Sequence, residues 1–327
     1  MTFARVLRPA VAAALMMAAQ AAWADDFPSR PVTMVVPFAP GGAGDILART
    51  LGPKLEPLWG GKSLIVENKT GAGGVIGAVD TAKAEPDGYT LMVAPSATMA
   101  VNVTLFKSLP YDPVKDFVPI ALVAQTPFVL VVNPDLPVKT VPELIAWLKK
   151  QNGAVSYATA GPGVPHHLFA ELFKSMTGVE MTPVAYRGSL PALNDVVAGH
   201  VPLMFVDIGP SLGIIRGGKV RALAVSTKQR FEGLPDVPPL DEAGVPGFDA
   251  ASWQMVVAPA KTPQPIVDTL HDQFAKALAD ADTRQAILRN GMLPVPPSSV
   301  ADLKAFMASE IDRWGKVVRQ AGLEHTQ

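Results

Sequence analysis

The chain has 327 residues, 49% of them apolar, and a formal net charge of −1. This length and composition suit one large or two medium-sized domains with well-filled cores. A near-neutral charge without a basic block argues against a nucleic-acid partner. Because the chain contains no cysteine, disulfides and thiolate metal sites are excluded.

The first 24 residues have the pattern of an export signal. Arg5 and Arg8 form a basic start, residues 10–19 form a short apolar core, and Ala22 and Ala24 fit the small-x-small cleavage pattern. The apolar run is too short to span a bilayer. We therefore expect residues 1–24 to be a signal peptide, cleaved after Ala24, and the mature protein to be exported and soluble.

Apolar runs of strand length alternate with helical stretches, which is typical of a parallel sheet with crossover helices. The expected strands are 32–37, 64–67, 89–94, 128–133, 155–159, 201–206, 220–226 and 253–258. The expected helices are 45–58, one opened by 71–77, one capped by Thr140 with Glu143, 165–176, 189–198, one capped by Thr262, and 300–321. Pro53 removes one hydrogen bond from the first helix, so we expect a kink or break there.

Two Pro-rich connections, near 123–127 and within 235–248, could carry the chain between two lobes. We therefore expect an α/β fold with residues 25–125 and 247–327 in lobe 1 and residues 126–246 in lobe 2. A ligand site would then lie in the cleft between the lobes, at the carboxyl ends of strands.

The segment PFAPGGAGD at 37–45 joins the first expected strand to the first expected helix. Its glycines let a ligand lie against the main chain. The first-turn N–H groups of a helix lack internal partners and sit at its positive pole, so such a turn can hold an anion without Lys or Arg. Asp45 could accept a ligand ammonium or a water, or it could cap the helix beginning at Ile46. We expect the turn to bind a carboxylate, with candidate contacts Phe38, Pro40, Gly41, Gly42 and Asp45.

A second glycine-rich turn, AGPG at 160–163, follows the strand that ends at Thr159 and again precedes a helix. Two helix starts that face each other across a cleft could clamp the two ends of one small anion. Thr159 and Gly161 are therefore candidate ligand contacts. The alternative is that glycine only shortens these turns.

Further polar candidates lie near other strand ends. Ser96 and Asn102 could donate hydrogen bonds to the ligand from the first lobe. Arg187 could pair with a ligand carboxylate in a bidentate manner, or it could instead hold an acidic side chain such as Asp207. Ser189 is expected to cap the helix that follows it.

His167 and Glu171 are four residues apart on an expected helix and could share a metal ion. The sequence offers no third ligand beside them, so we expect no metal site. We favour a histidine that hydrogen-bonds the backbone at the start of its helix.

The enzyme signatures in the chain are incomplete. Residues 60–63, GGKS, end like a phosphate loop, but that pattern requires glycine where Glu56 stands. The segment 71–77 has Ile76 in place of the third glycine of the dinucleotide fingerprint. No serine lies in a G-x-S-x-G motif. We therefore expect neither catalytic residues nor a cofactor.

Eight blocks, in their order and spacing, carry a family resemblance. They are PSRPVTMVVPFAPGGAGDILAR (28–49), VENKTGAGGVIG (66–77), PDGYTLMVAPSATMAVN (86–102), LPYDPVKDFVPI (109–120), YATAGPGVPHHLFAELF (157–173), VAYRGSLPAL (184–193), VRALAVSTKQRFEGLPDVPPLDEAG (220–244) and ASEIDRWGKVVRQAG (308–322). With these blocks nearly the whole mature chain resembles the Bug family, the periplasmic substrate-binding proteins of tripartite tricarboxylate transporters.

The resemblance implies a two-lobed periplasmic-binding-protein fold of type II that closes around a small carboxylate. In the family, the turns matching 37–45 and 159–163 grip one carboxylate through backbone N–H groups and ordered waters. The other ligand contacts vary, so the identity of the substrate does not transfer. His167 and Asp207 are further candidate contacts. The pair Pro165-His166 and Pro202 depart from the family pattern.

The resemblance also implies a non-catalytic periplasmic receptor that delivers its ligand to the large and small membrane subunits of the transporter. A sensor kinase is a second expected partner, and we expect a monomer. Two alternatives stay open: a sensor that binds its anion without supporting uptake, and an enzyme on the same fold that uses His167 and Asp207.

Overall fold

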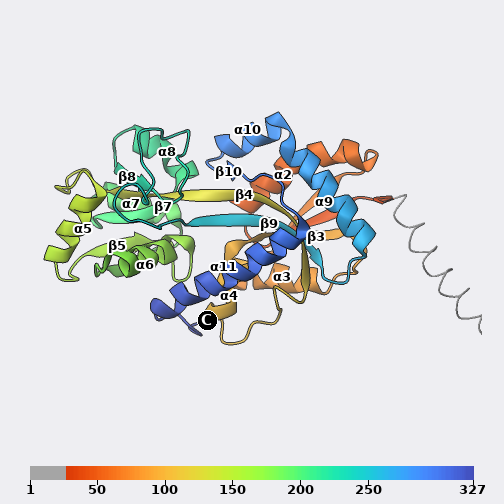
Figure 1. Ribbon diagram of the computed structural model, residues 1–327, viewed down its shortest axis with the longest axis horizontal. Coiled ribbons are helices and arrows are strands. Elements are labelled where there is room, and N and C mark those ends of the chain that lie inside the picture. Colours follow the sequence, from red (N-terminus) through yellow and green to blue (C-terminus); the bar gives the residue numbers. More distant parts are fainter. Residues whose placement is uncertain (1–26) are drawn as a thin grey trace, which may run out of the picture.

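A computed structural model describes residues 27–327, so the expected signal peptide lies outside the described residues. The strands form two connected halves of one sheet, which lie at opposite ends of the molecule (Figure 1). In the half that we call sheet A, β1 (Val32–Val36) pairs in parallel with β2 (Leu64–Asn68) and β3 (Thr90–Pro95). Strand β9 (Ala251–Pro259) runs antiparallel to β3.

The second half, sheet B, repeats this parallel arrangement. Strand β5 (Ser156–Thr159) pairs in parallel with β6 (Thr182–Ala185) and β7 (Leu203–Asp207). Strand β8 (Arg221–Val225) joins sheet B through an antiparallel pairing. All eight expected strands are present, and the α/β fold is confirmed.

Strand β4 (Phe117–Val132) belongs to both halves, since its first part pairs with β9 and its last residues pair with β7 and β8. The segment 123–127, expected to be a Pro-rich connection, is the interior of this strand, and β4 passes from one half to the other at the end of the segment. Pro119 is tolerated because the register with β9 shifts beside it, as prolines in strands require.

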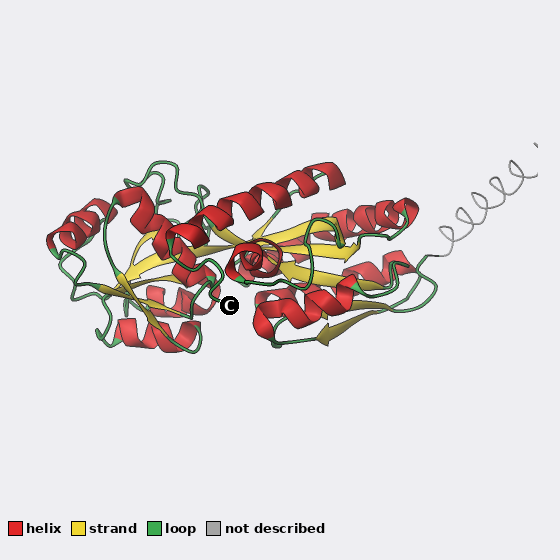
Figure 2. Cartoon of the chain, turned by 90° about the horizontal axis from the view of Figure 1, so that it is seen from below, coloured by secondary structure: helices red, strands yellow, loops and turns green. Residues whose placement is uncertain are grey.

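Helices cover both faces of the strands (Figure 2). Those beside sheet A are α2 (Ala43–Leu55), α3 (Val75–Ala82), α4 (Asn102–Leu105), α9 (Gln264–Ala279) and α10 (Ala281–Arg289). Those beside sheet B are α5 (Val141–Lys150), α6 (Pro165–Thr177), α7 (Ser189–Val197) and α8 (Ile208–Arg216). Three short helical turns belong to the same half as sheet A: η1 (Glu56–Trp59), η2 (Ala72–Gly74) and η3 (Ala97–Val101). The short strand β10 (Leu293–Pro294) pairs antiparallel with β4. Within residues 27–327, none of the helices has the length and apolarity to cross a membrane.

Three expectations about helix ends need correction. Helix α2 continues through Pro53 and changes to the η1 turn only at Glu56, because proline removes a single bond close to the helix end. Thr262 does not cap α9: its hydroxyl donates to the Pro259 carbonyl at 2.8 Å. Ser189 does not cap α7, whose N-cap is Gly188. The Thr140 cap of α5 is confirmed.

Helix α11 (Val300–Gln320) packs against both halves of the molecule (Figure 1). The Trp314 ring stacks on Phe169 of α6, with centroids 5.4 Å apart. The buried Glu310 carboxylate accepts the indole N–H groups of Trp253, in β9, and of Trp314, each at 2.8 Å. One apolar core therefore extends from sheet A into sheet B beneath α11.

The start of α11 offers a stability test with an internal control. The Ser299 hydroxyl accepts the Asp302 N–H at 3.1 Å and caps the helix. Losing a serine cap typically costs about 1 kcal/mol. We expect Ser299→Ala to lower the free energy of unfolding by about that amount in urea titrations. Ser298→Ala, next to it but not a cap, should leave the midpoint unchanged; equal effects would contradict the capping role.

Candidate functional site

The first glycine-rich turn connects β1 to α2, as expected. Gly41 has a φ of 84°, which favours glycine, and Gly42 is the N-cap of α2 with extended backbone angles. No side chain caps this helix. The first-turn amides of α2 are therefore free to bind an anion through main-chain hydrogen bonds.

The second glycine-rich turn connects β5 to α6 and reaches across to the sheet A half. Gly163 has a φ of 73°, and a Cβ atom there would lie 2.7 Å from the Leu105 side chain of α4. No side chain caps α6, whose N-cap is Val164. The Thr159 hydroxyl is fully buried and bonds within the turn, donating to the Gly161 carbonyl at 3.1 Å. Thr159 therefore holds the turn in shape.

Two cavities adjoin the start of α2, and both are lined by Gly42 and Ala43. The one that we call the α6 cavity has a volume of about 320 Å³ and extends toward α6. Its lining residues are Val36, Pro37, Phe38, Ala39, Gly42, Ala43, Gly44, Asp45, Val93, Pro95, Pro165, His166 and Gln254. Residues from the starts of both α2 and α6 therefore line one cavity, whereas no residue of the second turn, 159–163, lines it.

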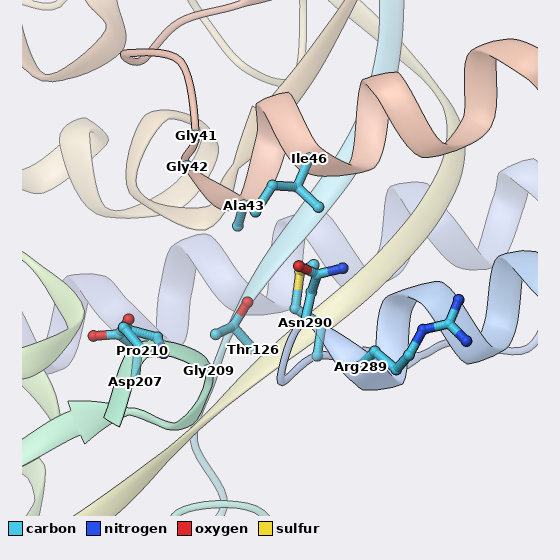
Figure 3. A pocket seen from close by; sticks show the side chains of 11 residues that line it. Gly41, Gly42, Ala43, Ile46, Thr126, Asp207, Gly209, Pro210, Arg289 and Asn290 are labelled. Atoms are coloured by element: carbon cyan, nitrogen blue, oxygen red, sulfur yellow. The ribbon is translucent and has the colours of Figure 1, made fainter. Parts of the chain in front are cut away.

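The second space, the α8 cavity, has a volume of about 350 Å³ and extends toward the start of α8. Gly41, Gly42, Ala43 and Ile46 lie along one side, opposite Asp207, Thr126 and Asn290 (Figure 3). Gly209, Pro210, Arg289 and Met292 complete the lining. This cavity therefore also lies between elements of the two halves.

Beside the α8 cavity, the two halves meet through their main chains. A Cβ atom on Gly209, in the first turn of α8, would lie 2.7 Å from the Asn290 carbonyl oxygen. A Cβ atom on Gly291 would lie 2.5 Å from the Gly209 Cα atom. Only residues without side chains permit so close an approach.

Asp207 lines the α8 cavity, and its carboxylate is hydrogen-bonded by neighbouring side chains. His166 Nε2 lies 3.1 Å from Asp207 Oδ1, and the Ser189 hydroxyl donates to the same oxygen at 2.5 Å. Burial raises the pKa of Asp207, but the hydrogen bonds from His166 and Ser189 outweigh it, so the pKa lies below its usual value. The alternative that Arg187 holds Asp207 is wrong, because the carboxylate is bonded by His166 and Ser189 instead. Arg187 is exposed.

Asp45 also has protein partners. It accepts the Gly41 N–H at 3.0 Å and pairs with Arg49 and Asn68. The hydrogen bond from Arg49 is the main reason that the pKa of Asp45 lies below its usual value, although burial raises it. Its interpretation as the helix cap is wrong, since α2 begins two residues earlier, after Gly42. Asp45 instead fixes the shape of the first turn from within the helix.

Of the other predicted ligand contacts, Phe38 lines one of these two cavities and the rest do not. Ser96 shares a hydrogen bond with Ser252 at 3.1 Å, and the Asn102 amide donates to the Gly73 carbonyl at 3.0 Å. Phe38 lines the α6 cavity and is 41% exposed. Pro40 is exposed and Gly161 lies in the second turn, and neither lines a cavity near α2.

His167 is a buried residue in the first turn of α6. Its Nε2 lies 3.8 Å from Glu171, which also accepts from the Tyr157 hydroxyl at 2.7 Å. Burial lowers the pKa of His167. The expected hydrogen bond to the backbone is absent, because Nδ1 has no partner. Among residues 27–327, no three His, Cys, Asp or Glu residues are grouped so that they could hold a metal ion.

Sequence reasoning missed three polar residues of the cavities: His166, Gln254 and Thr126. Each has a buried polar atom without a partner. His166 was visible as a departure from the family pattern, whereas Gln254 and Thr126 lie inside apolar strands and carry no sequence signal.

An α/β protein with two sheet halves, and with helix starts from both halves around one cleft, has the architecture of the two-lobed solute-binding proteins. The family model described as the tripartite tricarboxylate transporter family receptor, TctC, matches residues 54–323. The chain belongs to this family of periplasmic receptors.

Relatives agree with this assignment over nearly the whole chain. Protein BugT of Bordetella pertussis is 39% identical over 300 residues, which cover 91% of each chain. A solved structure of an R. palustris protein with adipate is 38% identical, with a TM-score of 0.79, and the match covers 91% of this chain and 99% of that one. MatC from Rhodopseudomonas palustris with bound malate is 36% identical, with a TM-score of 0.75, covering 89% and 100%.

Proposed function

We propose that this receptor binds a small carboxylate between its two halves and delivers it to the membrane subunits of a tripartite tricarboxylate transporter. The observation that carries the proposal is the uncapped start of α2, which opens onto both cavities. Its free amides suit a carboxylate. Support also comes from relatives solved with adipate and malate.

In this proposal residues 25–125 and 247–327 form one lobe and residues 126–246 the other, and the ligand is held where they meet. The contacts proposed for it are Phe38, Pro40, Gly41, Gly42, Asp45, Ser96, Asn102, Thr159, Gly161, His167, Arg187 and Asp207. Phe38, Gly41, Gly42, Asp45 and Asp207 have the strongest support, because each of them lines a cavity.

We propose that the protein catalyses no reaction. The rival arrangement, His167 acting with Asp207, has no support in the contacts, since His167 lies beside Glu171 while Asp207 bonds His166 and Ser189. Signal-peptide cleavage after Ala24, action as a monomer in the periplasm, and a sensor kinase as second partner complete the proposal.

The experiment is a melting-temperature screen with carboxylates. A ligand at about 100 times its Kd stabilises the folded state by about 2.7 kcal/mol. For a chain of this size that amounts to a rise of roughly 5 °C. We expect such a rise with at least one dicarboxylate, hydroxy acid or keto acid, with no product formed. No shift across a broad carboxylate panel would overturn the proposal.

A further inference from the structure

One block of the family resemblance, residues 308–322, lines neither cavity. Most of this block lies in α11, where Glu310 is buried and only 6% exposed. The Glu310 Oε1 atom pairs with Arg313 Nη1 at 3.2 Å. A buried charge is tolerated only where it is paired and hydrogen-bonded. The other partners of these two side chains therefore determine what the pair holds together.

Glu310 joins α11 to the sheet A half. Its Oε2 atom accepts the indole N–H of Trp253 at 2.8 Å. Trp253 is 1% exposed and lies in β9, opposite Gln125 of β4, within sheet A. Phe306, also in α11, packs edge-on against the Trp253 ring, with centroids 5.4 Å apart. The Glu310 side of the pair is thus fixed to the strand that leaves sheet A.

Arg313 joins α11 to the sheet B half. Its Nη2 atom donates to the Asp249 carbonyl. The neighbours of Asp249 are bound to sheet B: the Phe248 ring stacks on Phe205 of β7, with centroids 6.0 Å apart. The Ala250 N–H donates at 2.8 Å to the carbonyl of the residue that follows β8. The Arg313 side of the pair is thus fixed to the sheet B half.

The segment between these two contacts, residues 249–253, crosses from one half to the other. It passes beside the crossing of β4, since Ala251 is opposite Pro127 in sheet A and the next residue of β4, Phe128, is opposite Asp207 of β7. We call residues 249–253 the crossing segment. The bend of this segment sets how the two halves are aligned, because each of its ends is attached to a different half.

The Glu310–Arg313 pair contacts the crossing segment at both of its ends. The planar guanidinium presents its nitrogens in a fixed arrangement, with Nη1 toward Glu310 and Nη2 toward Asp249. Glu310 in turn holds Trp253. The distance between the two ends is therefore restrained by one rigid group and one buried carboxylate.

We infer that the Glu310–Arg313 pair fixes the bend of the crossing segment and so holds the two halves in the alignment that binds the solute. This inference rests on the proposed function and adds two positioning residues to it. Neither side chain lines a cavity, so both act through the crossing segment. When only a fraction of the molecules has the competent alignment, the apparent Kd rises by the inverse of that fraction.

The test replaces Arg313 in the mature chain. Arg313→Met retains an aliphatic stem over the Trp314 ring, which the guanidinium now covers at 5.2 Å, but removes both polar contacts. We expect binding to weaken about tenfold, as for a competent fraction of about one tenth. Arg313→Lys keeps the charge, yet its single nitrogen cannot span Glu310 and Asp249, so we expect at least about threefold weaker binding. Isothermal titration with malate and adipate, and then with the other carboxylates of the melting screen, gives the affinities.

Two control variants lie in or beside the same helix. Lys316 pairs with Asp312 at 2.7 Å on the exposed side of α11, so Lys316→Met removes a charge from α11 without touching the pair. Ser299→Ala weakens the start of the helix. Both should bind within about twofold of the natural protein, although Ser299→Ala is less stable. A purely structural role for Arg313 would instead give lower stability with unchanged affinity.

Hydrogen exchange of the protein without ligand adds a second measurement. Peptides that cover the crossing segment should exchange faster in Arg313→Met than in the natural protein or in Lys316→Met. Melting curves show whether each variant folds, and Arg313→Lys provides the conservative substitution if Arg313→Met does not.

Three results would overturn the inference: unchanged affinity in Arg313→Met, full affinity in Arg313→Lys, or unchanged exchange of the crossing segment. Each of them would leave the receptor function standing. If the natural protein bound none of the carboxylates in the panel, the proposed function itself would be overturned. Hydrogen exchange would still decide whether the pair fixes the crossing segment.

Discussion

Replacing Gly42 with leucine is expected to weaken carboxylate binding more than about 100-fold, equivalent to roughly 2.7 kcal/mol. Gly42 lines both cavities, so the new side chain takes space from the ligand in either one. The leucine side chain would also cover the first-turn amide groups of α2. Each charge-assisted hydrogen bond contributes about 1.5–3 kcal/mol, so losing one or two accounts for the effect.

The fold should tolerate this change. The backbone of Gly42 is extended, with a φ of −77°, and a Cβ atom would meet only the Ala39 carbonyl oxygen, at 3.5 Å. A poorer N-cap residue typically costs about 1 kcal/mol of stability. Calorimetric titration with a ligand found in the melting screen gives the affinity, and urea unfolding gives the stability. Gly213→Leu, at an open position of α8, is the matched control. Unchanged affinity for Gly42→Leu would mean that the first turn does not bind the ligand.

Gly209→Ala is expected to weaken binding by roughly 30-fold, or about 2 kcal/mol. Its methyl group would lie 2.7 Å from the Asn290 carbonyl oxygen, and real Cβ atoms essentially never come so close to another heavy atom. Something must then shift, and because Gly209 and Asn290 belong to different halves, we expect the halves to move apart. Hydrogen bonds that the ligand makes to both halves lengthen together, because they share one cleft.

The control for this prediction lies one helical turn further along α8. A methyl group on Gly213 would meet no atom within 4 Å, so Gly213→Ala adds the same group to the same helix without the contact. Isothermal titration of the two variants with a ligand found in the melting screen should show weaker binding only for Gly209→Ala. If both variants bind like the natural protein, the contact between Gly209 and Asn290 has no part in closure.

Prediction from the sequence was most accurate for segments whose local chemistry and tertiary environment favour the same structure. Thr140 caps α5 in the structure because the side chain and the helix end act within one turn. The two glycine-rich turns likewise follow strands and open helices, since strand, turn and helix are contiguous. Such short-range features can be read without knowledge of the rest of the fold.

Other elements depended on distant partners. Strand β4 contains Pro119 and Pro127, which mark a connection when only local propensity is considered, yet pairing with β9 makes the segment a strand. Helix α8 begins Ile-Gly-Pro, so no apolar period reveals it. Helix α10 has few apolar residues and was missed for the same reason.

The candidate site shows the same division. The α2 start could be predicted because its donors are main-chain groups set by local geometry. The partner of Asp207 could not, because His166 is 41 positions away and competes with Arg187 for the role. Only the packing of α6 beside β7 decides between them.

The passage of β4 through both halves also bears on how the protein can move. Extended chains resist stretching, whereas a narrow ribbon of strands bends and twists more readily, and bulges are the places where it does so. The β4–β9 register shifts twice, beside Pro119 and beside Leu122, shortly before β4 enters sheet B. We therefore expect opening to bend this ribbon, so that the halves separate at the proposed ligand site while staying joined behind it. A bending motion of this kind would bring the facing edges of the two halves back to the same alignment each time a solute is bound.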